Sequence, residues 1–162
     1  MVKASVPGNA NLDWAVANNM PDWRFGINSE QFRWMENCWW LYETEIPQIE
    51  TKPGETLWFI AEGIDYSYKI LLDGQIVCEH EGMFSHVHLS LETNKPGILQ
   101  IWIAPPPKDP LGEKDTQAEA AQSCKPAVSY GWDWHPRLIP SGIWMEAYLE
   151  IRQENRLFIS VK

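Results

Sequence analysis

Aliphatic side chains alternate with polar or aromatic ones along several short stretches of this 162-residue chain, and this pattern constrains its fold more than any other feature. The alternation is clear in residues 87–91, 99–103 and 144–151. In the first stretch a valine and two leucines are separated by a histidine and a serine. A period of two puts alternate side chains on opposite faces of a β-strand, so each stretch predicts a strand with one buried face.

Other short apolar runs are bounded by turn residues and predict strands as well. Asp73-Gly74 predicts a two-residue hairpin turn, because both central positions of such a turn need a positive φ. Pro53-Gly54 and Pro96-Gly97 mark two more turns. Eight short strands joined by turns predict an all-β domain, a β-sandwich. The additional strands are expected at about residues 39–46, 56–62, 67–72, 75–79 and 156–161.

A single short helix is predicted at residues 9–20. Leu12, Val16 and Met20 recur there every four residues, Asn11 is a candidate N-cap, and the helix ends before a proline. The only long irregular stretch is residues 105–129, and loops of this length in compact domains are usually functional or flexible.

Composition and charge exclude several classes of partner. The chain has 13 Lys and Arg against 22 Asp and Glu, a net charge of −9, whereas nucleic acids and anionic membranes select basic surfaces. No run of about 18 apolar residues is present that could span a membrane. The first eight residues lack the apolar core of a signal peptide, and the sequence does not identify a compartment.

Cysteine and histidine patterns give no strong metal signal. Cys38, Cys78 and Cys124 are odd in number and lack CxxC spacing, so we expect mainly buried thiols and no zinc cluster. His86 and His88 share one strand face, which favours surface positions over a metal site. The adjacent Trp39 and Trp40 must point to opposite strand faces, so one is expected in the core and the other at a rim or interface.

The stretch from residue 130 to residue 144 carries the clearest chemistry. Asp133 stands between Trp132 and Trp134, in a segment punctuated by glycines and prolines. Indole faces cover the C–H side of a pyranose, and a carboxylate accepts hydrogen bonds from vicinal hydroxyls, so the trio suits a sugar site. An alternative is that the two indoles are structural plugs with a capping aspartate between them. Since the 105–129 stretch leads directly into this segment, we expect both on one rim of the sandwich.

Seven short motifs occur in a fixed order along the chain: Val6-Pro-Gly8, Trp39–Tyr42, Glu62–Tyr66, Leu72-Asp-Gly74, Glu79–Phe84, Ala104–Pro107 and the segment from Gly131 to Trp144. Together they resemble the N-terminal sugar-binding domain of glycoside hydrolase family 2, in its β-mannosidase-like and β-galactosidase-like branches. The resemblance implies a jelly-roll sandwich of the galactose-binding type over residues 1–152, with 153–162 beginning a linker strand toward a second sandwich.

The same resemblance implies roles for particular residues. Asp133, Trp132 and Trp134 would bind the terminal hexose of a β-glycoside. From the residues themselves, His135 and Arg137 are expected beside this site without touching the sugar, with Arg137 paired to a carboxylate that braces the segment. Hydrolysis in the family uses two glutamates in a barrel of roughly 250 residues. No such barrel is present here, so no catalytic residue is assigned and the isolated chain is expected to be inactive. No cofactor and no metal are implied.

Two positions depart from the family pattern and leave the sugar open. His135 stands where glycine is usual, and Cys124-Lys125 stands where an Arg-Lys pair is common. Two other hypotheses remain beside the main one: an autonomous carbohydrate-binding module that grips a glycan through its tryptophans, and a domain that only stabilises a larger enzyme. The sequence also leaves open whether that enzyme is homo-oligomeric.

Overall fold

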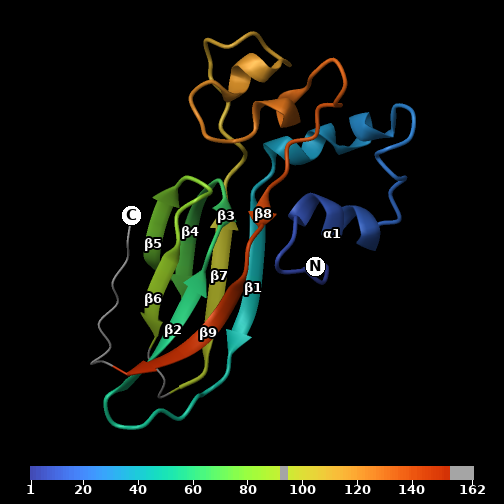
Figure 1. The fold of residues 1–162 in the computed structure, drawn as a ribbon. Helices are drawn as coiled ribbons and strands as arrows, with labels where there is room; N and C mark the ends of the chain where they lie inside the picture. Colours follow the sequence, from blue (N-terminus) through green and yellow to red (C-terminus); the bar gives the residue numbers. More distant parts are fainter. Residues whose placement is uncertain (92–94, 154–162) are drawn as a thin grey trace.

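The computed structural model describes residues 1–91 and 95–153, which form two antiparallel sheets facing one another (Figure 1). One sheet has the strand order β1-β7-β4-β5 and the other β6-β2-β9, while β3 and β8 make a short two-stranded ladder. The predicted all-β sandwich is therefore confirmed. The strands are β1 Trp40–Ile46, β2 Glu55–Ala61, β3 Ile64–Asp65, β4 Ser67–Leu72, β5 Gln75–Glu81, β6 Val87–Leu91, β7 Gly97–Ile103, β8 Gly142–Ile143 and β9 Ala147–Gln153. The strand predicted at 156–161 lies outside the described residues.

The core lies between the two sheets and is made by the inward face of each alternating stretch. In β7, Leu99, Ile101 and Ile103 are buried, as the period of two predicts. They meet residues from both sheets in one apolar cluster. Its buried members are Ile46, Leu57, Phe59, Ala61, Ile64, Tyr68, Ile70, Val87, Leu91, Leu99, Ile101, Ile103 and Ile143.

The predicted Asp73-Gly74 turn joins β4 to β5. Its two residues have φ values of 50° and 79°, so the expected positive φ at both central positions is confirmed. The Asp73 carboxylate also accepts a hydrogen bond from the backbone N–H of Ile98 at 2.9 Å. This contact ties the turn to the start of β7.

The strand predicted at 144–151 is present as β9 but begins three residues later, at Ala147, because the chain bends between β8 and β9. Trp144 lies in the bend: its backbone N–H donates to the carbonyl of Gly63 at 3.1 Å, and its indole N–H donates to the carbonyl of Met83 at 2.9 Å. A Cβ at Gly63 would lie only 2.6 Å from the indole nitrogen of Trp144. The close approach of these two segments therefore replaces strand pairing at this point.

The predicted N-terminal helix is present as α1 Ala10–Ala17 and is shorter than the predicted span. Its N-cap is Asn9, whose side chain accepts from the backbone N–H of Asn11 at 2.9 Å. The assignment of Asn11 as the N-cap was wrong: its side chain is buried and accepts a hydrogen bond from Ser141 N–H at 3.0 Å. Asn11 thus fastens the helix to the segment that enters β8.

Beyond one end of the sandwich the chain forms a layer of loops and three 3₁₀ helices, η1 Asn28–Asn37, η2 Gln117–Ala120 and η3 Ala127–Tyr130. We call residues 28–38 and 105–141 the crown. The teal, gold and orange segments in Figure 1 show these two parts of the chain at the same end of the molecule. The expectation that the 105–129 stretch shares a rim with the Asp133 segment is therefore confirmed.

Candidate functional site

The segment that carries Asp133 folds back on itself as a narrow loop, which we call the signature hairpin (residues 129–138). Leu138 N–H donates to the carbonyl of Ser129 at 2.9 Å. Nearer the tip, Trp132 N–H donates to the carbonyl of His135 at 2.9 Å, and His135 N–H donates back to Trp132 at 3.2 Å. The backbone pairing of the two arms therefore continues to Trp132 and His135, and Asp133 and Trp134 form a two-residue turn.

The tip of the signature hairpin is exposed. The side chain of Trp134 is 73% exposed and that of Trp132 is 45% exposed. Asp133 is exposed too, and it makes no hydrogen bond or ion pair with another described residue. Neither indole is a buried plug. The tip therefore carries a free carboxylate and two exposed indoles.

His135 fixes the base of this tip against a neighbouring loop. Its ring lies 6.4 Å from the ring of Trp23 and 6.2 Å, edge to face, from that of Trp134. Its Nδ1 atom lies 2.7 Å from the carbonyl oxygen of Pro136. The half-buried imidazole thus lies between the tip and the chain that leads into η1.

Arg137 is buried behind the tip and is held by two carboxylates. Its Nε and Nη2 atoms each donate to Glu36 at 2.9 Å, and Nη1 donates to Glu119 at 2.5 Å and to the carbonyl of Tyr130 at 3.1 Å. The predicted pairing of Arg137 with a carboxylate is present, with two partners. Because Glu36 lies in η1 and Glu119 in η2, one guanidinium links three parts of the crown.

The pKa values of this cluster follow from burial and pairing. Burial alone would raise the pKa of Glu36, but hydrogen bonds from Arg137 and Lys108 outweigh it and lower that pKa. Burial opposes the charge of Arg137, and its two carboxylate partners still raise its pKa. Lys108 reaches Glu36 at 2.8 Å. Glu36 and Arg137 are therefore both charged at neutral pH.

A second buried ion pair, which the sequence did not reveal, lies at the root of the same segment. The Lys125 ammonium is 2.6 Å from both carboxylate oxygens of Asp65 and 2.8 Å from the carbonyl oxygen of Pro140. Burial raises the pKa of Asp65 and lowers that of Lys125, and their mutual attraction opposes both shifts. Asp65 falls inside the predicted Glu62–Tyr66 motif, which was the only signal that could have drawn attention to it.

The remaining polar candidates do not form a metal centre. Within residues 1–91 and 95–153, no group of three His, Cys, Asp or Glu side chains is placed to hold a metal ion. His86 and His88 are exposed and stacked on one another, 6.3 Å apart, as expected for surface positions. The expectation of mainly buried thiols was wrong: Cys124 is exposed, and the other two free cysteines are half-buried. In the same described part, no helix has the length and apolarity needed to cross a bilayer.

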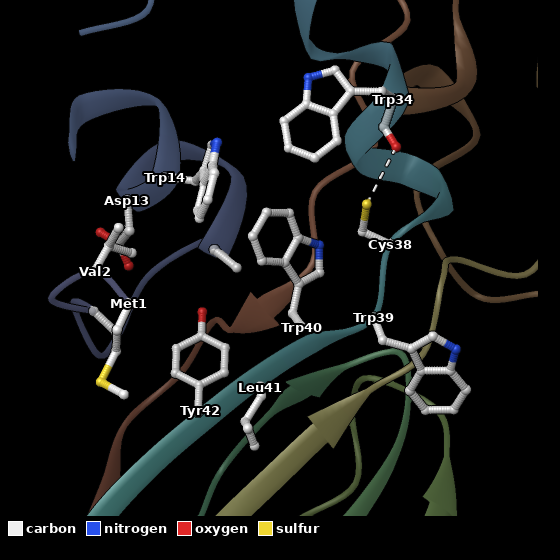
Figure 2. A pocket seen from close by; sticks show the side chains of 12 residues that line it. Met1, Val2, Asp13, Trp14, Trp34, Cys38, Trp39, Trp40, Leu41 and Tyr42 are labelled. Atoms are coloured by element: carbon white, nitrogen blue, oxygen red, sulfur yellow. Dashed lines mark hydrogen bonds between the residues drawn. The ribbon is translucent and has the colours of Figure 1, made fainter. Parts of the chain in front are cut away.

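A separate hollow of about 340 Å³ lies between α1, η1 and the start of β1 (Figure 2). Its wall includes Trp14, which packs edge to face against both Trp34 and Trp40 at centroid distances of 6.2 and 6.3 Å. Trp40 packs on the core while Trp39 is 52% exposed, so the predicted division between these neighbours is confirmed. None of the predicted sugar-site residues lines this hollow.

Comparison with known proteins gives a consistent family signal. Residues 1–145 match the family described as "Glycosyl hydrolase 2 galactose-binding domain-like". The chain is 26% identical over 161 residues to Beta-mannosidase B of Aspergillus fumigatus and 29% identical over 161 residues to that of Aspergillus flavus. In each case the alignment covers 90% of this chain and 19% of the relative.

A solved structure agrees with the sequence relatives. The beta-D-mannosidase of Dictyoglomus thermophilum superposes with a TM-score of 0.70 at 26% identity, over 93% of this chain and 20% of that one. The chain therefore spans about a fifth of the length of the proteins it matches.

Proposed function

This chain belongs to the glycosyl hydrolase 2 galactose-binding domain-like family, and on that premise we propose that it is the N-terminal sugar-binding domain of a longer glycoside hydrolase. The enzyme would be a retaining exo-β-glycosidase of the β-mannosidase or β-galactosidase type. In this proposal the chain contributes part of the sugar subsite, and a catalytic barrel outside it contributes the two glutamates that carry out hydrolysis.

The observation that supports this proposal best is the free carboxylate of Asp133 at the tip of a braced hairpin. A projecting tip is convex, whereas small-ligand sites are concave and enclose most of their ligand. Asp133 and its two indoles therefore need a second surface to complete a pocket. A barrel mouth that receives the tip would supply that surface.

Each residue has a defined task in such a site. The carboxylate of Asp133 accepts hydrogen bonds from sugar hydroxyls and so fixes the orientation of the ring. Trp132 and Trp134 cover its C–H faces. If the hydroxyl contacts tighten as the ring distorts, they lower the barrier as well as improving binding.

The test is the substitution Asp133→Asn in the longer enzyme, assayed on an aryl β-mannoside and an aryl β-galactoside. Losing a hydrogen bond to a charged group costs about 1.5–3 kcal/mol, so kcat/KM is expected to fall roughly 10- to 150-fold on the preferred substrate. The matched control is Asp73→Asn, because Asp73 is also an exposed turn aspartate but lies at the β4–β5 turn. The control should keep the kcat/KM of the wild type. An Asp133→Asn enzyme whose kcat/KM equals that of the wild type and of the control would refute the role of Asp133.

The exposure of Trp134 favours one other candidate, an autonomous carbohydrate-binding module. Calorimetric titration of the 162-residue chain with manno- and galacto-oligosaccharides separates the two. The main proposal predicts little or no binding, because half of the pocket is missing. The alternative predicts binding that is lost in Trp132→Ala or Trp134→Ala.

A further inference from the structure

Below the signature hairpin, Asp65, Lys125 and Pro140 form a narrow base, which we call the neck. The Lys125 ammonium donates to the carbonyl of Pro140, so this bond joins the two ends of the loop that carries the hairpin. Residues 126–139 form the closed loop beyond this bond. Asp65 is the Cα partner of Gly142 in the β3–β8 ladder, so its carboxylate attaches the loop to the sandwich.

The ammonium of Lys125 is completely satisfied at the neck. A lysine carries three N–H donors, and three acceptors surround it: two carboxylate oxygens at 2.6 Å and one carbonyl oxygen at 2.8 Å. The side chains of Lys125 and Asp65 are 0% and 4% exposed, respectively. With every donor used, the ammonium has one preferred position.

Burial of this pair is difficult to explain by stability alone. Desolvation of a buried ion pair cancels much of its attraction, and a well-packed apolar pair of similar volume often stabilises a fold as well or better. What an apolar pair does not provide is direction, because apolar contacts are non-directional whereas a satisfied ammonium fixes three acceptors relative to one another. The pair is therefore better suited to fixing the direction in which the loop leaves the sandwich than to adding stability.

Successive cross-loop contacts carry this constraint from the neck to the tip. Above the Lys125–Pro140 bond come the Leu138–Ser129 bond and the contact of Arg137 with the carbonyl of Tyr130. The paired backbone groups of Trp132 and His135 form the last rung, directly below Asp133. Every rung joins the two arms of one hairpin, so the direction set at the neck determines where the tip points.

We propose that Lys125 and Asp65 are positioning residues that fix the signature hairpin on the sandwich and so set the place of the Asp133 carboxylate. The first claim, that the neck fixes the hairpin on the sandwich, is mechanical and concerns only this chain. The second claim, that this placement matters for sugar recognition, rests on the proposed function. Lys125 and Asp65 touch no sugar in this account and act through the hairpin.

The mechanical part is tested by amide hydrogen exchange in the 162-residue chain, comparing wild type with the double variant Asp65→Asn/Lys125→Met. This variant removes both charges, so no unpaired charge is left buried. Exchange at the amides of Trp132, His135 and Leu138 is expected to accelerate at least tenfold, while amides of the β2–β9 ladder stay within twofold. The matched control is Lys69→Met/Glu79→Gln, which removes an exposed 3.0 Å pair on the sheet and should leave hairpin exchange unchanged.

Unchanged hairpin exchange in the double variant would overturn the proposal. An equal acceleration in the hairpin and in the β2–β9 ladder would also overturn it, because that pattern reports general destabilisation. Should the double variant fail to fold, Asp65→Asn/Lys125→Gln is decided by the same criteria, because it also leaves no unpaired charge buried and keeps a polar side chain at each position.

The functional part is tested in the longer enzyme by a double-mutant cycle. Asp65→Asn/Lys125→Met should lower kcat/KM when Asp133 is present and should lower it by a clearly smaller factor in the Asp133→Asn background, where only the placement of Trp132 and Trp134 can still be affected. Independent, multiplicative losses would contradict positioning through Asp133. If Asp133→Asn alone has no effect, the proposed function fails, and the exchange experiment still decides whether the neck holds the hairpin.

Discussion

The sandwich and the crown are stabilised by different kinds of contact. The sandwich core is an almost wholly apolar cluster between two sheets. The crown instead buries Glu36, Glu119, Lys125 and Arg137, each paired with an opposite charge. Apolar side chains can be buried favourably in many arrangements, whereas only a few arrangements satisfy the geometry that ion pairs and hydrogen bonds require. The comparison indicates that the sandwich supplies stability and the crown fixes one shape for the loop it carries.

The largest effect on stability is expected from a substitution of Arg137 in the crown. Arg137→Met leaves Glu36 and Glu119 buried without their shared partner, which costs about 3–5 kcal/mol in comparable cases. We expect a loss of that size in the free energy of unfolding measured by urea denaturation. The triple variant Arg137→Met/Glu36→Gln/Glu119→Gln should recover a large part of the loss. A single variant with less than about 1 kcal/mol of loss would show that the cluster is not structurally important.

In the sandwich, Leu57→Ala removes a side chain that is 1% exposed. The cavity should cost about 2–5 kcal/mol by the same urea measurement. The two regions should then differ in where protection from hydrogen exchange is lost. Both variants should lower it wherever exchange requires global unfolding. Leu57→Ala should add local losses in the β2–β9 and β2–β6 ladders, and Arg137→Met should add local losses in the crown. Identical exchange patterns would contradict the division between the two regions.

Acid should act on the crown through Glu36. Its pKa is lowered in the folded state from an ordinary value of 4.5, so its contribution to stability is present above that value and is lost as pH falls below it. We expect the free energy of unfolding to decrease between pH 5 and pH 3, and the decrease to be smaller in Glu36→Gln. The measurement is urea denaturation across that range. Parallel curves for the two proteins would rule out this linkage.

The smallest effect on stability is expected at the tip. Trp134→Ala removes a mostly exposed indole, so the free energy of unfolding should change by no more than about 0.5 kcal/mol. In the longer enzyme the same variant should still weaken sugar recognition. A loss of stability of several kcal/mol would instead show that the Trp134 indole packs against the fold and has a structural role.

The sandwich could be predicted from the sequence because strands and turns are determined by residues close together in the chain. The alternation of Leu99, Ile101 and Ile103 and the Asp73-Gly74 turn depend on near neighbours in the chain. Sequence reasoning failed where distant segments meet. The bend at Trp144 follows from its contacts with Gly63 and Met83, which lie far away in the sequence.

The candidate site shows the same limit. The Trp-Asp-Trp trio identified the tip, and Arg137 could be expected to need a carboxylate. Its partner Glu36 lies 101 positions away, and Asp65 lies 60 positions from Lys125. Nothing in the local pattern distinguishes Glu36 from the other acidic residues of the chain, and Asp65 stands out only by lying within the Glu62–Tyr66 motif. Only the folded crown shows which carboxylates meet which cations.

The most direct test of the central proposal is a structure of the longer enzyme with a sugar bound in its active site. The decisive quantity is the distance from the nearer carboxylate oxygen of Asp133 to the nearest sugar hydroxyl. The account predicts a hydrogen bond of about 2.5–3.0 Å, with the indole of Trp132 or Trp134 against the ring. An Asp133 carboxylate turned to solvent, with no contact to the sugar even through a water molecule, would contradict it.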